Sequence, residues 1–168
     1  MKRQKYLRAL RILIKEYGSQ NVVYFDESGF ASHKGRLSGW APMGQKLYTC
    51  VKGKREKRTN LLMAQRGKEW LAPVVFTGSC TAKTVSTWLE DFLLKELDKP
   101  SIIIMDNAPV HNKKVIRNLL EKHGHTMLAL PPYSPDFNPI EQSFGAMKKR
   151  REGMPVTTTV EKLILSYS

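Results

Sequence analysis

The chain is 168 residues long, which suffices for one domain with a hydrophobic core and is too short for two domains of full size. Its hydrophobic share of 41% and charged share of 26% are ordinary for a globular protein and exclude disordered and fibrous classes. Twenty-eight Lys and Arg residues against fifteen Asp and Glu residues leave a net charge of +13, which favours a polyanionic partner, above all nucleic acid.

An anionic membrane is the alternative partner, but no apolar run approaches the ~20 residues that span a bilayer. The apolar residues of the basic N-terminal segment are spaced rather than continuous, so we do not interpret it as a signal sequence. Cys50 and Cys80 lack CxxC spacing and predict neither a zinc site nor a disulfide framework, which fits a reducing cytoplasm.

The first predicted element is an amphipathic helix over residues 1–17, in which Leu7, Leu10 and Ile14 recur at helical spacing. Gly18 ends this helix. Its basic residues cover the remaining surface, where solvation is the favoured interpretation and contact with DNA the alternative.

A strand is predicted over residues 21–25, and two acids follow it, Asp26 and Glu27. Because side chains alternate along a strand, Asp26 shares a face with Tyr24, whereas Glu27 shares a face with Phe25. The two acids therefore cannot both point into one site, and the alternation does not choose between them.

The most basic part of the chain is residues 31–58, whose glycines and prolines predict a loop or hairpin insert. Trp40 either stacks on a base or packs under the loop, and packing is the favoured interpretation. Five cations close together could neutralise several DNA phosphates. They are Lys52, Lys54, Arg55, Lys57 and Arg58.

Two apolar runs, residues 59–65 and 71–77, flank a turn and predict an antiparallel pair, which forms a three-stranded meander with the first strand. Residues 81–97 predict a helix, with Thr81 as its cap. The side chains expected on the buried side of this helix are Val85, Trp88, Leu89 and Phe92.

The run from Ile102 to Met105 is apolar throughout and predicts a strand covered on both faces, with Asp106 at its end. Residues 115–123 predict a helix, and residues 126–130 predict a further strand. Three residues between Asp106 and this helix are candidates for contact with DNA, although a lone His in a turn is more often a local hydrogen-bonding residue. They are His111, Lys113 and Lys114.

The segment PPYSPDFNP predicts a rigid loop that leads into a helix, with Asn138 as N-cap, Pro139 as first residue and Glu141 as third. Glu141 then points along an open, basic flank; the alternative is a capping box at the start of the helix. The expected buried stripe is Ile140, Phe144 and Met147. The helix ends in the candidate DNA-contacting residues Lys148, Lys149 and Arg150, and a last helix is predicted over residues 157–167.

The sequence contains three blocks that each carry an acid: VVYFDESGF, IIIMDNAPVH and LPPYSPDFNPIEQSFGAMK. They resemble the catalytic blocks of the mariner-type superfamily of DDE transposases, in its bacterial insertion-sequence branch. The thirty-four residues between Asp106 and Glu141 are a spacing typical of this branch. The resemblance assigns Asp26 rather than Glu27, and it implies that Asp26, Asp106 and Glu141 are the catalytic and metal-binding residues.

The predicted order of three strands, helix, strand, helix, strand and helix is that of an α/β ribonuclease H-like fold, a mixed five-stranded sheet flanked by helices. Transposases of this superfamily have that fold, which places the first and fourth strands side by side and so brings Asp26 and Asp106 together. We expect residues 1–168 to form a single catalytic domain, with a leading helix over 1–18 and a truncated C-terminal helix over 153–168.

The resemblance implies cut-and-paste transposition, in which double-stranded DNA is cleaved and strands are transferred with two Mg²⁺ ions, or Mn²⁺ as a substitute. Three carboxylates suffice, because Mg²⁺ keeps several of its waters. The implied partners are transposon ends, target DNA and a second copy of the chain, at the bacterial nucleoid. Relatives also carry N-terminal helix-turn-helix modules, which we expect to be missing here and to come from another reading frame, or to have been lost by decay.

Two other functions are open at this point. A DNA-binding remnant or domesticated protein would keep the fold and the basic surface without cutting DNA. A ribonuclease H-like nuclease would use similar metals on another substrate. The presence of all three acids favours cleavage over the remnant, and the last block favours a transposase over the nuclease.

Overall fold

The computed structural model describes residues 2–31, 42–45, 58–108 and 112–167, so most of the expected basic insert lies outside the described residues. Five strands form one sheet in the order β3, β2, β1, β4, β5. Their bounds are β1 Val22–Phe30, β2 Thr59–Arg66, β3 Glu69–Thr77, β4 Ile102–Met105 and β5 Thr126–Ala129.

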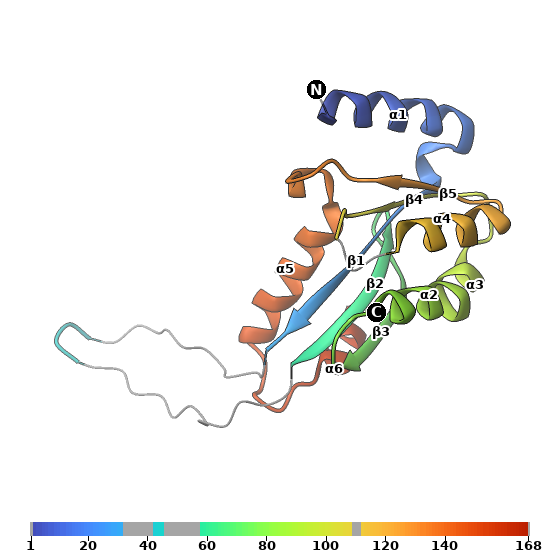
Figure 1. Cartoon of the computed structure of the whole chain (residues 1–168). Helices are drawn as coiled ribbons and strands as arrows, with labels where there is room; N and C mark the ends of the chain where they lie inside the picture. The colour runs from blue at the N-terminus through green and yellow to red at the C-terminus, as the bar shows by residue number, and fades with distance from the viewer. Residues whose placement is uncertain (1, 32–41, 46–57, 109–111, 168) are drawn as a thin grey trace.

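The sheet is mixed, because β1, β2 and β3 pair antiparallel whereas β4 runs parallel to both β1 and β5. The meander of the first three strands, predicted from the two apolar runs, is confirmed. The pairing of the first strand with the fourth is confirmed as well. Figure 1 shows helices on both sides of this sheet, as expected for the predicted fold.

Strand β1 is longer than the sequence pattern predicted, since it continues through Asp26 to Phe30 instead of ending at Phe25. The reason is its antiparallel neighbour, because β2 pairs with β1 from Tyr24 to Phe30. The parallel ladder with β4 ends at Tyr24. Asp26 therefore lies inside β1 but just beyond the end of its ladder with β4.

One face of the sheet is covered by a helical segment, made of α2 Ala82–Trp88, a π-helical turn Leu89–Leu93 and α3 Leu94–Glu96, and by α4 Lys113–Lys122 (Figure 1). Thr81 caps α2 as predicted. Trp88 is buried, and its Nε1 donates to the carbonyl of Ala72 at 2.8 Å. Phe92 was expected in the core but is 45% exposed, because the π-helical turn changes the helical phase and directs Leu93 inward instead.

The opposite face is covered by α1 Lys2–Tyr17, α5 Pro139–Glu152 and α6 Val160–Leu165. Helix α5 buries the predicted stripe of Ile140, Phe144 and Met147. Helix α1 directs Tyr6 into the core, whereas Leu7, which was expected there, is 37% exposed. Tyr6 is favoured at this position because it stacks on the ring of Phe137.

The ends of the helices agree with the turn signals in the sequence. Gly18 and Gly124, which follow α1 and α4, have φ of 87° and 78°, a region that glycine adopts without strain. Helix α6 is shorter than predicted, because Thr159 caps it and it begins only at Val160. No helix among the described residues is long and apolar enough to cross a membrane.

Candidate active site

Asp26 lies in β1, and Asp106 directly follows the last residue of the neighbouring parallel strand β4. Tyr24 of β1 is the register partner of Ile104 of β4, so two further residues along each strand lead to Asp26 and Asp106. Because side chains alternate, both acids belong to the face that contains Tyr24 and Ile104. That face is the one covered by α1 and α5.

Glu27 belongs to the opposite face, together with Phe25. The pKa of the Cys80 thiol is raised to about 12, first by burial and then by the Glu27 carboxylate. The strand pattern left the choice between Asp26 and Glu27 open. In the structure, Glu27 is on the face covered by α2 and α4, whereas Asp26 is on the face covered by α1 and α5. Only Asp26 shares a face with Asp106.

Glu141 is the third residue of α5, as predicted, and it is exposed at the mouth of a pocket of about 510 Å³. Asp106 lines the same pocket, so the pocket joins the carboxyl end of β4 to the first turn of α5. The other lining residues are Asn107, Ala108, Leu130, Pro131, Pro132, Tyr133, Ser134 and Pro135.

Asn138 occupies the N-cap position of α5, but its side chain makes no capping hydrogen bond. Instead its Nδ2 donates to Oδ2 of Asp26 at 3.0 Å. The capping box with Glu141 is not formed either, because the backbone N–H of Asn138 donates to the carbonyl of Pro135 at 2.9 Å. The prediction of Asn138 as the N-cap residue is therefore confirmed, but its side chain bonds a partner distant in sequence instead of the local backbone.

Asp26 is half-buried, and its pKa is raised to about 7. Burial is the largest cause, and repulsion by the carboxylates of Asp106 and Glu141 adds to it. Two hydrogen bonds to the carboxylate lower this pKa in part. The backbone N–H of Glu27 donates to Oδ1 at 2.7 Å, and the Asn138 amide donates to Oδ2. The three predicted acids are thus close enough to interact electrostatically.

The donor set of this site fits Mg²⁺ or Mn²⁺, because all three groups are hard carboxylate oxygens and a cation would relieve their mutual repulsion. Within the described part of the chain, no three His, Cys, Asp or Glu side chains lie close enough together to hold one ion. The arrangement offers pairs instead: Asp26 with Asp106 at the strand ends, and Asp106 with Glu141 in the pocket. Pairs suit Mg²⁺, which takes one or two carboxylates and keeps its waters.

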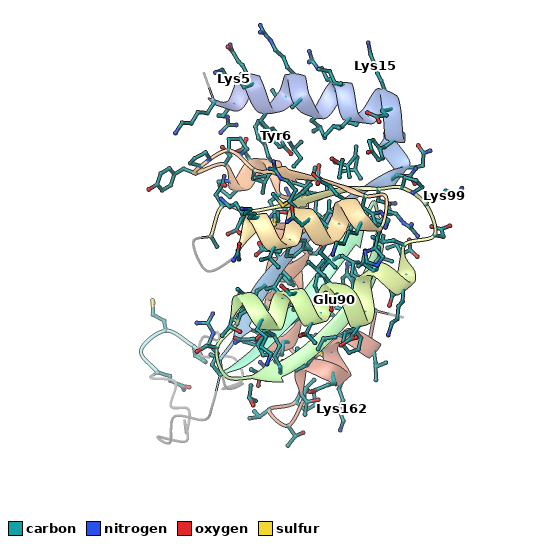
Figure 2. All side chains as sticks on the ribbon, turned by 45° about the vertical axis from the view of Figure 1, so that its right-hand side comes forward. Lys5, Tyr6, Lys15, Glu90, Lys99 and Lys162 are labelled. Atoms are coloured by element: carbon teal, nitrogen blue, oxygen red, sulfur yellow. The ribbon has the colours of Figure 1, made fainter. Side chains whose placement is uncertain are left out.

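The loop between β5 and α5 is fastened to α1. The guanidinium of Arg3 forms a two-pronged ion pair with Asp136 and lies 4.3 Å from the centroid of the Phe137 ring. The rings of Tyr6 and Phe137 stack with an interplanar angle of 16°. These contacts fix the two residues directly before Asn138. In Figure 2, Tyr6 points from α1 toward the body of the molecule.

Six of the residues predicted to contact DNA lie outside the described residues: Trp40, Lys52, Lys54, Arg55, Lys57 and His111. Arg58 is described, and its guanidinium lies against Gly29, where a Cβ would come within 2.1 Å of it. Lys113 is half-buried and donates to Oδ1 of Asn107, which also lines the pocket, while Lys114 is exposed.

The predicted basic residues at the end of α5 differ in their surroundings. Lys149 is exposed. The ammonium of Lys148 lies 5.5 Å from the centroid of the Phe30 ring. Arg150 donates to the carbonyl of Ser166 at 2.9 Å and packs on the ring of Tyr167. Part of its guanidinium is therefore engaged within the fold and is not available to DNA.

Two residues beside the acids were not predicted to belong to the site. Tyr133 lines the pocket, is 98% exposed and has a φ of 53°, which is strained for a residue other than glycine. The signal that could have found it is an aromatic residue between prolines, where no strand or helix can bury it. The sequence did single out Asn138, but as the N-cap of a helix. That local role hid the possibility that the same amide binds Asp26.

Residues 21–164, most of the chain, match the family model described as DDE superfamily endonuclease. A comparison with curated proteins finds no match.

Solved structures of Mos1 are similar to the whole chain. The Mos1 strand transfer complex gives a TM-score of 0.76 at 20% identity over 99% of this chain and 51% of that one. The Mos1 mariner paired end complex with Mn gives 0.77 at 19% identity, over 99% and 52%. The Mos1 transposase catalytic domain with Raltegravir and Mg gives 0.70 at 18% identity, over 99% and 80%. This likeness confirms the predicted ribonuclease H-like fold, and the chain spans about half the length of the chains in the two complexes.

Proposed function

Because this chain belongs to the DDE superfamily of endonucleases, we propose that it is the catalytic domain of a DDE transposase of the mariner type, in its bacterial insertion-sequence branch. The proposed reaction is metal-dependent cleavage of double-stranded DNA followed by strand transfer. The three sequence blocks support the finer assignment, since each carries one acid of the site.

A single observation carries this proposal. Asp26 of β1 interacts electrostatically with Asp106, which follows the adjacent parallel strand β4, and with Glu141 of α5, which lines the same pocket as Asp106. Phosphodiester cleavage without a covalent intermediate requires activation of the attacking oxygen and stabilisation of the leaving oxygen. Carboxylates gathered in a surface pocket suit that chemistry because they can hold divalent cations beside a phosphate.

In the proposed mechanism, Asp26 of β1 and Asp106, which follows β4, would hold two Mg²⁺ ions, and Glu141 would complete the second site from α5. Bound Mg²⁺ would lower the pKa of the attacking water and neutralise charge on the leaving oxygen. The chain's own residues define the position of the phosphate: the pocket is walled by Pro131 and Pro132, and Lys113 adds a positive charge beside Asn107.

The proposed partners are transposon ends and target DNA, and pairing two ends requires at least a homodimer. The net charge of +13 supports binding to a polyanion. We further propose that the ends are recognised by an N-terminal region supplied by another reading frame, and that the protein acts in the cytoplasm at the nucleoid.

The test is a plasmid cleavage assay. Purified protein is incubated with supercoiled plasmid and Mg²⁺, Mn²⁺ or a chelator, and nicked and linear products are measured. We expect metal-dependent nicking that falls to background in Asp106→Asn. The matched control is Asp98→Asn, an exposed acid paired with Arg66 away from the pocket, which should cleave like the wild type.

Two results would contradict the proposal. Salt-sensitive DNA binding without nicking, even after an end-recognition region is added in trans, would support the DNA-binding remnant. Faster cleavage of an RNA–DNA hybrid than of duplex DNA would support a ribonuclease.

A further inference from the structure

Asn138 differs from an ordinary helix cap. Its side chain is 2% exposed, makes no capping bond and donates instead to Oδ2 of Asp26 at 3.0 Å. Its Oδ1 is buried and has no hydrogen-bond partner. Burying an amide oxygen without a partner costs free energy, so a sequence selected for stability alone gains nothing from this arrangement.

We propose that Asn138 is a positioning residue of the site: its amide fixes the orientation of the Asp26 carboxylate for metal binding. This inference rests on the proposed function and assigns it a residue beyond the three acids. With Oδ2 held by Asn138 and Oδ1 held by the backbone N–H of Glu27, the carboxylate is fixed at both oxygens. Each oxygen keeps a further lone pair for a cation.

The backbone around Asn138 is itself held in place. Asp136 and Phe137, the two residues before it, are fixed to α1 by Arg3 and Tyr6. Ile140, two residues after it in the first turn of α5, is fully buried against the sheet. Asn138 therefore has little freedom to follow the Asp26 side chain, and its amide acts as a rigid donor.

The test compares Mn²⁺ binding by the wild-type chain, Asn138→Ala and Asn60→Ala, measured from the signal of free Mn²⁺ in electron paramagnetic resonance. Asn60 is a matched control: it is 5% exposed, its Nδ2 donates one bond, to Gly78, and its Oδ1 is also buried without a partner. Removing a residue that orients a metal ligand typically weakens metal affinity by about 10- to 100-fold. We expect about tenfold weaker binding in Asn138→Ala and a change below about twofold in Asn60→Ala.

Equal weakening in both variants, or in neither, would overturn the inference. A second measurement needs no metal: urea unfolding of Asp26→Ala, Asn138→Ala and the double variant. We expect the effects on the unfolding equilibrium constant to be non-additive by about threefold or more, because the two side chains share a hydrogen bond. Additive effects would overturn the inference. If wild-type protein bound no Mn²⁺, the proposed function would fail and the inference with it, whereas equal Mn²⁺ affinity of the wild type and Asn138→Ala would overturn the inference alone.

Discussion

The ring of Tyr6 stacks on the ring of Phe137 with centroids 5.4 Å apart, which joins the first helix to the loop that leads into the helix of Glu141. The two residues are 131 positions apart in the sequence, and Phe137 immediately precedes Asn138. Helix α1 therefore stabilises the loop between β5 and α5 in addition to covering the sheet.

We predict that Tyr6→Phe leaves the free energy of unfolding unchanged or raises it by about 1 kcal/mol, because the Tyr6 hydroxyl is buried without a partner. Tyr6→Ala should lower it by about 3–5 kcal/mol, since it removes the stacked ring and leaves a cavity. Urea denaturation at neutral pH measures both values. A large loss in Tyr6→Phe would show that the hydroxyl has an essential partner.

Asp26→Asn should raise the melting temperature of metal-free protein at pH 8, because the wild-type carboxylate is buried and repelled by Asp106 and Glu141. The raised pKa means that the stability conferred by the protonated group is present at low pH and is lost as the pH rises through about 7. A gain of about 1–2 kcal/mol corresponds to roughly 2–8 °C for a chain of this size. Scanning fluorimetry in chelator measures the shift, and added Mn²⁺ should stabilise only the wild type. A lower melting temperature in the variant would contradict the prediction.

His125 should make the protein less stable in mild acid. Its Nδ1 accepts a hydrogen bond from the backbone N–H of Ser101 at 3.1 Å, and burial followed by repulsion from His123 lowers its pKa below 6.5. The unfolded chain therefore binds the proton first, so stability is complete above pH 6.5 and falls as the pH drops below it.

His125→Asn keeps an acceptor near Nδ1 and cannot be protonated, so the free energy of unfolding should depend less on pH between 7 and 5 than in the wild type. The exposed His123 gives the control variant His123→Asn, which should keep most of the wild-type dependence. Denaturant midpoints across this pH range measure this dependence. Identical profiles for all three proteins would exclude His125 as the cause of the lower stability in acid.

The exposed cations at the start of α1 should contact DNA, because the contacts with Asp136 and Phe137 place this end of the helix beside the loop that lines the pocket. Figure 2 shows Lys5 pointing away from the body of the molecule. Replacing Lys2, Lys5 and Arg8 by Gln should lower the slope of log affinity against log salt by about 3, at ~0.9 per phosphate contact.

Fluorescence anisotropy of labelled duplex DNA at several salt concentrations measures this slope. The control triple variant replaces three exposed lysines near the opposite ends of β4 and β5, Lys95, Lys99 and Lys122. An equal fall in both triple variants would indicate a non-specific effect of net charge.

Tyr133→Gly should leave stability unchanged or slightly increased, since the side chain is 98% exposed and glycine adopts a φ of 53° without strain. We expect the same variant to raise the KM for plasmid nicking, because an exposed ring at the pocket is suited to stacking on a DNA base. Unchanged nicking kinetics would exclude a substrate contact.

Local sequence patterns were enough to predict the helices and strands and their order. The apolar run before Asp106 could only be a buried strand, and the prolines before Glu141 placed that residue in the first turn of a helix. These features depend on side-chain periodicity and on backbone restrictions of proline, which act between near neighbours and can therefore be interpreted locally. The same local patterns singled out Asp106 and Glu141 as candidate residues, whereas Asp26 was preferred over Glu27 only through the family resemblance of its sequence block.

The partners of the acids depend on how the whole chain packs. The alternation along β1 puts Asp26 and Glu27 on opposite faces, but only the pairing of β1 with β4 shows that Asp26 is the acid on the side of Asp106. Asn138 had the local signature of a helix cap, and it bonds Asp26 instead, 112 positions away. Local patterns could not reveal this, because a polar side chain at a helix start bonds whichever buried group the packing of the whole chain brings to it.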